Sequence, residues 1–184
     1  MEKKRCPWVN DNPLMIEYHD EEWGKPLKDD RKLFEYLVLD AFQAGLSWNT
    51  IINKRENFKI AFDNFNPEKI ASYTQKDIDR LMQNKGIIRN KLKIVSTIIN
   101  AQKFLELKKQ TSFNNYIWSF VNHKTIKNSP SDIKDYQSKS KESDEMSKDL
   151  KKRGFKFVGS TICYAFMQAA GLVNDHSKDC FRNN

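Results

Sequence analysis

Apolar residues recur along most of this chain at the three- and four-residue spacings that place them on one face of a helix. From Leu33 to Ala44 they form such a stripe, and Asp29 or Asp30 stands where the N-cap of that helix is expected. No segment alternates convincingly between apolar and polar residues, as a half-buried strand would. The pattern therefore predicts an all-α fold.

Two further helices are expected to flank a short turn. Thr74 and Asp77 have the spacing of a capping box, with Asp in place of Glu, and open a helix that ends near Asn84. The next apolar stripe begins near Asn90, and Gly86 between the two is free to take the left-handed conformation. This arrangement predicts a helix-hairpin-helix.

The second half of the chain combines helical and solvated segments. Helices are expected around residues 116–121 and from a cap at Ser143 to Gly154, followed by the buried apolar segment 157–172. Residues 124–141 are dominated by Lys, Ser, Asp and Asn. Such a composition predicts a mobile surface loop.

Length and composition exclude several classes of protein. The 184 residues can bury one sizeable core, so we expect a single domain over residues 1–184. No apolar run approaches the roughly 20 residues of a membrane span, and no apolar signal segment follows the basic start. Three cysteines do not make a disulfide framework in a chain of this length. We therefore expect a reduced, cytoplasmic protein with no membrane partner.

The net charge of +8 is concentrated in two stretches. Residues 85–93 hold four cations and no acid, and residues 148–156 hold five cations and one acid. A polyanion such as a nucleic acid is the expected partner of such stretches. The second stretch could be a second contact, but it is more typical of an ordinary charged helix.

The turn of the predicted hairpin offers a place for a phosphate. The N–H groups of residues 86–89 would lie at the start of the second helix, where the helix dipole favours an anion. Arg89, Lys91 and Lys93 would add positive charge nearby. Contacts of this kind hold the DNA backbone without reading its sequence. The alternative is an ordinary turn with a solvated basic face.

Cysteine and histidine residues lie near both ends of the chain: Cys6, His19, His176 and Cys180. Together they have the composition of a closed Cys2His2 zinc site, and a shared metal would fix two termini that otherwise fray. Four protein ligands leave no open position, so a structural zinc is favoured over a catalytic one. The alternative is two ordinary thiols and two surface histidines.

One carboxylate interrupts the apolar stripe of the first long helix. Asp40 is costly to bury alone, so either it is satisfied by Gln43, a helix end or a Lys, or it faces a pocket. Aromatic residues with one acid can hold a planar cation, although aromatic residues at helical spacing are more often core. Four aromatic residues are near in sequence: Trp8, Tyr18, Trp23 and Trp48.

Several longer motifs then resemble one known family. The most specific are QAGLSW at 43–48 and KKRGFKFVG at 151–159. Others are CPW at 6–8, YHD at 18–20, EWG at 22–24, KRE at 54–56, GIIR at 86–89, WSFVN at 118–122 and AGLVNDH at 170–176. From about residue 6 to residue 180, the chain is similar to 3-methyladenine DNA glycosylase I, the TAG family of helix-hairpin-helix glycosylases.

The resemblance implies a glycosylase-like helix-hairpin-helix fold in which one structural zinc ion joins the N- and C-termini. The implied zinc ligands are Cys6, His19, His176 and Cys180, and the implied base-binding residues are Trp8, Tyr18, Asp40 and Trp48. The implied DNA contacts are Gly45 and Leu46, which would enter the gap in the duplex, and Gly86, Ile87, Ile88, Arg89 and Lys91 at the hairpin.

Two positions depart from the family pattern. The pocket carboxylate of the family is usually Glu, and Asp40 is shorter by one C–C bond, about 1.5 Å. Met15 stands where relatives often carry Tyr. Both differences bear on how strongly and how selectively the pocket binds a base.

The activity implied is hydrolysis of the N-glycosidic bond of 3-methyladenine in alkylated double-stranded DNA. The products would be free 3-methyladenine and an abasic site, without lyase activity, and Asp40 would be the catalytic residue. No Asp or Glu lies in residues 107–131, where many related glycosylases place a catalytic Asp. We expect a monomer. The alternatives are a non-catalytic helix-hairpin-helix DNA-binding module with structural zinc, and a zinc hydrolase.

Overall fold

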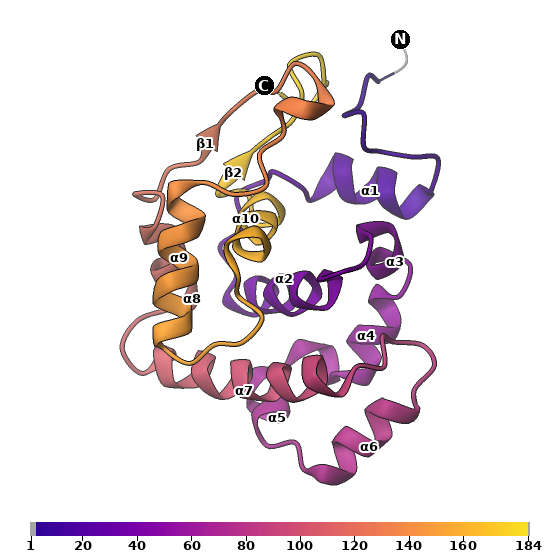
Figure 1. Cartoon of the computed structure of the whole chain (residues 1–184), viewed down its shortest axis with the longest axis vertical. Helices are drawn as coiled ribbons and strands as arrows, with labels where there is room; N and C mark the ends of the chain where they lie inside the picture. The colour runs from indigo at the N-terminus through magenta and orange to yellow at the C-terminus, as the bar shows by residue number, and fades with distance from the viewer. Residues whose placement is uncertain (1–2, 184) are drawn as a thin grey trace.

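The computed structural model describes residues 3–183, and these form a mostly helical fold (Figure 1). The helices and strands follow in this order: α1 (Pro13–Glu21), α2 (Asp30–Gln43), α3 (Trp48–Ile52), α4 (Arg55–Ala61), η1 (Asp63–Phe65), α5 (Pro67–Ala71), α6 (Gln75–Gln83), α7 (Lys91–Lys108), α8 (Phe113–Ser119), β1 (Ile126–Lys127), η2 (Ile133–Asp135), α9 (Lys141–Lys152), α10 (Ser160–Ala169) and β2 (Val173–Asn174). None of the helices described is both long enough and apolar enough to cross a bilayer.

Helix α2 forms the centre of the core, with α10 and α7 packed against it (Figure 1). Its ten residues from Leu33 to Phe42 are all buried, and Asp29 caps its start by accepting a hydrogen bond from the Lys32 N–H at 2.8 Å. The predicted stripe is therefore confirmed, although the helix is covered on every side. Burial on all sides explains why even the carboxyl groups of Glu35 and Asp40 are removed from solvent.

Capping residues set the boundaries of two other helices. The capping box of Thr74 and Asp77 is present at the start of α6, as predicted. Helix α9 starts three residues earlier than predicted, because Ser140 is its N-cap and Ser143 is the reciprocal partner in the capping box. The same helix ends before Gly154, which has a φ of +92°.

The hairpin between α6 and α7 has the predicted position but a different turn. Asn90 caps α7 by accepting a hydrogen bond from the Lys93 N–H at 3.2 Å. The left-handed conformation predicted for Gly86 is wrong, since its φ is outside the positive region. A Cβ at this position would lie 3.1 Å from Asn57, because the turn packs closely on α4. The close packing therefore favours glycine here.

Two short strands are an exception to the all-α prediction. Strand β1 pairs in parallel with β2, Ile126 opposite Val173, and closes residues 124–141 against the C-terminal segment. The two ends of the chain also meet, since the Phe181 N–H donates to the Lys4 carbonyl at 2.9 Å (Figure 1). Residues 124–141 are mostly exposed, as predicted, and their mobility stays a prediction.

Candidate functional site

The four predicted metal ligands lie together between the two ends of the chain. The ligand atoms of Cys6, His19, His176 and Cys180 are all within 4.8 Å of one another, and all four residues are buried. The Cys6 Sγ is 3.5 Å from His176 Nδ1, and the Cys180 Sγ is 3.4 Å from His19 Nε2. We call these four residues the Cys–His cluster.

Neighbouring groups fix the orientation of both imidazoles. His19 Nδ1 donates to the Asp20 carboxylate at 2.7 Å, and His176 Nε2 donates to the Trp23 carbonyl at 3.0 Å. Hydrogen bonds from Arg5 lower the pKa of Asp20 to about 2, so this acceptor is ionised. In each histidine the nitrogen that faces the sulfur atoms is then left with its lone pair, as in a metal ligand.

The two sulfur atoms differ in their pKa. At Cys6 burial opposes the thiolate, but hydrogen bonds, including one from the Ser177 N–H, outweigh it and lower the pKa to about 5, whereas burial raises the pKa of Cys180 to about 11. The Ser177 and Arg182 N–H groups donate to the two sulfur atoms at 3.3 and 3.4 Å. Tetrahedral zinc, with bonds of about 2.3 Å to sulfur and 2.0 Å to nitrogen, holds S and N ligands about 3.5 Å apart. The cluster fits a metal ion of this kind.

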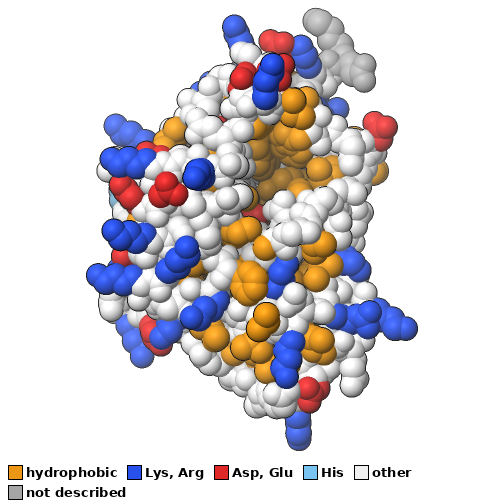
Figure 2. Space-filling view, viewed as in Figure 1, with side chains coloured by type: hydrophobic (Ala, Val, Ile, Leu, Met, Phe, Trp, Pro, Cys, Tyr) orange, Lys and Arg blue, Asp and Glu red, His pale blue; other side chains and the backbone are white. Residues whose placement is uncertain are grey.

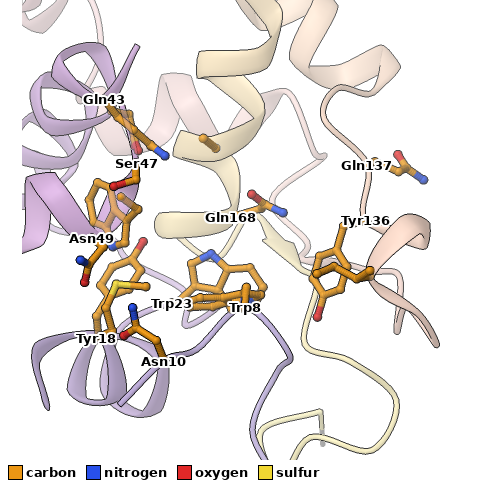
Figure 3. Close-up of a pocket in the computed structure, with 15 residues that line it drawn as sticks. Trp8, Asn10, Tyr18, Trp23, Gln43, Ser47, Asn49, Tyr136, Gln137 and Gln168 are labelled. Carbon is orange, nitrogen blue, oxygen red and sulfur yellow. The ribbon is translucent and has the colours of Figure 1, made fainter. Parts of the chain in front are cut away.

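A cavity of about 470 Å³ opens beside the cluster, and Figure 2 shows it as a hollow lined largely by apolar side chains. All four predicted base-binding residues line it. The lining residues come from both halves of the chain (Figure 3): Trp8, Asn10, Met15, Tyr18, Trp23, Asp40, Gln43, Ser47, Trp48, Asn49, Ile133, Tyr136, Gln137, Ala165 and Gln168. We call it the aromatic cavity.

Aromatic rings form two walls of this cavity. Tyr18 and Trp48 make one wall, with ring centroids 4.9 Å apart. Trp8 and Trp23 make another, 4.8 Å apart, and the Trp23 ring in turn packs at 4.7 Å on the His176 ring of the cluster. The second wall therefore depends on the position of the two chain ends.

Asp40 lies in the wall of the cavity with its side chain unpaired. It is 2% exposed, and its Oδ2 has no hydrogen-bond partner among the residues described. Of the alternatives open from the sequence, the pocket is the one realised: neither Gln43 nor a lysine satisfies this oxygen. Burial raises the pKa of Asp40 well above its usual range, because the low-polarity surroundings disfavour the charged carboxylate relative to the neutral acid.

Two indole groups of the cavity are also unpaired. The Nε1 atoms of Trp8 and Trp48 are buried and have no partner within the part of the chain that the structure describes. Buried polar groups are nearly always hydrogen-bonded. With the Tyr136 hydroxyl, four residues that line one aromatic cavity have an unpaired buried polar atom, which indicates a site shaped for a flat, polar ligand.

A buried ion-pair network, which the sequence did not reveal, lies next to Asp40. Arg55 donates to Glu35 at 2.8 Å and to both oxygens of Glu22 at 2.7 and 2.8 Å. Its positive charge lowers the pKa of Asp40 without overcoming burial. Because two other carboxylates hold the guanidinium, it forms no hydrogen bond with Asp40 in the structure.

The predicted wedge residues follow directly after α2. Gly45 has a φ of +78° and open space around it, and the Leu46 side chain is 40% exposed. Lys93 does not add an exposed cation to the hairpin, as the sequence suggested. Its buried Nζ donates to the carbonyls of Phe42 and Ala44 at 2.9 and 2.6 Å, and so anchors the turn that presents Leu46.

The hairpin residues divide into anchoring and exposed groups. The Ile87 side chain is buried, and the Gly86 and Ile87 N–H groups bond to Asn84. Arg89 and Lys91 are exposed, and among the described residues no partner accepts from the Ile88 or Arg89 N–H. An anion contact at this hairpin would use those two amides and the two exposed cations.

Several further cavity residues were missed by reasoning from the sequence, Gln168 and Tyr136 among them. Gln168 is a polar residue within the apolar segment 157–172, so it carried the same signal as Asp40. Tyr136 belongs to residues 124–141, whose composition gives no sign that they reach a cavity. The pairing of β1 with β2, together with contacts such as the 2.9 Å bond from the Lys178 N–H to the Pro130 carbonyl, brings that segment there.

Comparisons with known proteins agree with this geometry. The family model described as methyladenine glycosylase matches residues 8–183. DNA-3-methyladenine glycosylase of Haemophilus influenzae is 51% identical over 177 residues, 96% of each chain. A crystal structure of 3-methyladenine DNA glycosylase I (TAG) shares 48% identity and a TM-score of 0.96, covering 98% of this chain and 100% of that one. A variant of TAG in complex with 3-methyladenine shares 38% identity and a TM-score of 0.93, covering 98% and 97%.

The matched residues include the two walls of the aromatic cavity, the hairpin and three of the four residues of the Cys–His cluster. The identity extends over almost the full length of both chains. This chain therefore belongs to the methyladenine glycosylase family.

Proposed function

We propose that this protein hydrolyses the N-glycosidic bond of 3-methyladenine in alkylated double-stranded DNA. The observation that carries the proposal is a buried, unpaired carboxyl group, Asp40, in an aromatic cavity beside an exposed wedge. The names of the relatives, and a structure of one of them with 3-methyladenine, support the same substrate. The products are the free base and an abasic site, and no lyase step is proposed.

Charge explains how the cavity selects the damaged base. Methylation at N3 makes adenine cationic in DNA, so the bond to C1′ is weakened and the base leaves as a neutral molecule. Tyr18 and Trp48 stack on the extruded base, and Trp8 lines the cavity with them. As the cation enters, the Asp40 carboxyl releases its proton to solvent, and the carboxylate accepts hydrogen bonds from the adenine edge. Normal adenine carries no charge to drive this ionisation.

The remaining steps need little further chemistry from the protein. The leaving group is already activated, so water can attack the deoxyribosyl cation without a second carboxylate. This agrees with the lack of Asp and Glu in residues 107–131. Gly45 and Leu46 fill the gap left in the duplex, and Arg89 and Lys91 hold phosphates through the open hairpin amides. We propose that the protein acts as a monomer.

The Cys–His cluster is proposed to hold one structural zinc ion. All four ligand positions are filled by protein, so the metal would leave no site for water or substrate. Its chemistry would be limited to fixing the two chain ends, and through Trp23 the second cavity wall. A zinc hydrolase is disfavoured because it requires an open metal position.

Chromatography of the bases released from methylated duplex DNA tests the proposal. We expect the wild-type protein to release 3-methyladenine, and Asp40→Asn to release it at least about 100-fold more slowly, since a buried charge contact is lost. No release by the wild type would favour a non-catalytic DNA-binding module. Equal release by both proteins would show that Asp40 does not have the assigned role.

A further inference from the structure

One polar residue of the aromatic cavity has no part in the proposed reaction so far. Gln168 lies near the end of α10, and it lines the cavity (Figure 3). Its Nε2 donates to Asp175 Oδ2 at 2.7 Å. The side chain is therefore held in place from outside the cavity.

The partner of Gln168 is itself held by two other donors. Asp175 is 2% exposed, and it accepts from the Tyr164 hydroxyl at 2.8 Å and from Asn128 Nδ2 at 2.6 Å. An ionised carboxylate only accepts hydrogen bonds. The amide group of Gln168 must therefore direct its nitrogen toward Asp175, and the assignment of its oxygen follows from this network.

The oxygen of this amide is available to a ligand. Figure 3 shows it on the side of the carboxamide nearer Ser47, with the nitrogen on the other side. No donor among the described residues reaches Gln168 Oε1. The cavity thus contains a hydrogen-bond acceptor whose orientation cannot be reversed without breaking the bond to Asp175.

We propose that Gln168 determines which methylated purine is removed. This inference rests on the proposed function. The fixed oxygen accepts a hydrogen bond from the exocyclic amine of 3-methyladenine. A 3-methylguanine base in the same orientation presents a carbonyl oxygen at that position, so two acceptors face each other. A site built to bond a donor rejects analogues that lack it, because its own polar atom is left unpaired once the base fills the cavity.

The test is the ratio of 3-methyladenine to 3-methylguanine released from one methylated DNA sample. Gln168→Met keeps the length of the side chain and removes the acceptor, and Asp175 retains its other two donors. We expect the ratio to fall about tenfold, the equivalent of one lost hydrogen bond. Gln75→Met is the matched control, because Gln75 makes the same amide-to-carboxylate bond of 2.7 Å to Asp79 on the exposed face of α6. Its ratio should equal that of the wild type.

An unchanged ratio in a folded Gln168→Met protein would overturn the inference. A wild type that releases neither base would instead overturn the proposed function. A second measurement uses only the wild type and so does not depend on the variant folding. Free 3-methyladenine should inhibit base release at least about tenfold better than 3-methylpurine, which lacks the amine. Equal inhibition by the two would also contradict the proposal.

Discussion

The Cys–His cluster and the aromatic cavity lie next to each other but differ in whether their buried polar atoms have hydrogen-bond partners. In the cluster, Cys6 and Cys180 accept from backbone N–H groups and both imidazoles donate outward. In the cavity, Asp40 Oδ2 and the indole nitrogens of Trp8 and Trp48 have no partner among the residues described. The two sites share a wall, because Trp23 packs on the cluster and lines the cavity.

The contrast indicates that the cluster contributes to stability, whereas the cavity keeps polar atoms unpaired for a ligand. An unpaired buried polar atom costs about 1–3 kcal/mol, so the cavity lowers the stability of the free protein. A metal ion held by the cluster would offset this cost, since metal binding contributes directly to folding. Substitutions in the two sites should therefore change stability in opposite directions.

The largest effect is expected in the cluster. Cys6→Ser should lower bound zinc from about one equivalent to near zero, because three ligands remain. The loss of several kcal/mol should lower the midpoint of thermal unfolding by about 10 °C or more in a chain of this size. Metal analysis and calorimetry measure both quantities. Cys163→Ala changes a buried cysteine outside the cluster and should keep the metal. A Cys6→Ser protein with full zinc content would contradict the assignment.

A smaller effect of opposite sign is expected in the cavity. Burial raises the pKa of Asp40 in the folded protein above its unfolded value of about 3.9, so the folded state binds more protons in that range. Stability contributed at this position is present below the unfolded pKa and is lost as pH rises toward the folded pKa. At pH 8 the free energy of unfolding of Asp40→Asn should therefore exceed that of the wild type by at least about 1 kcal/mol, and its unfolding temperature should be higher.

The pH dependence of this difference is the informative measurement. The advantage of Asp40→Asn should shrink as pH falls from 8 to 4, in thermal or urea unfolding at each pH. Asp11→Asn, at an exposed position, should show no such trend. A variant that is less stable than the wild type at pH 8 would show that the carboxyl is satisfied in the free protein.

Local signals in the sequence predicted much of this molecule. The stripe from Leu33, the capping box at Thr74 and the start of a helix near Asn90 are each decided by residues within one or two turns, and the structure confirms them. The meeting of the two chain ends at the Cys–His cluster was predicted mainly from the residue types and the family motifs. Asp40 could be singled out because a carboxylate within an apolar stripe is costly to bury without a partner.

The errors arose where distant segments decide the local structure. Gly86 is small because α4 lies against its turn, and Lys93 is buried because the carbonyls at the end of α2 need a donor. Strands of two residues are too short to show alternation, so β1 and β2 left no pattern. Because this pairing left no pattern, the sequence showed no sign that Tyr136 lies at the cavity or that Asp175 accepts from Gln168.

Binding of free 3-methyladenine to the isolated protein tests the central claim most directly, because it involves the cavity and no DNA. Quenching of tryptophan fluorescence at pH 7 should show saturable binding to the wild type, with Trp8, Trp23 and Trp48 around the ligand. Because the free base is neutral, this measurement tests the hydrogen bonds to Asp40 rather than its charge. Asp40→Leu, which has no acceptor, should bind at least about tenfold more weakly while unfolding at a higher temperature. Equal affinity of the two proteins would contradict the claim that the unpaired carboxyl is kept for the base.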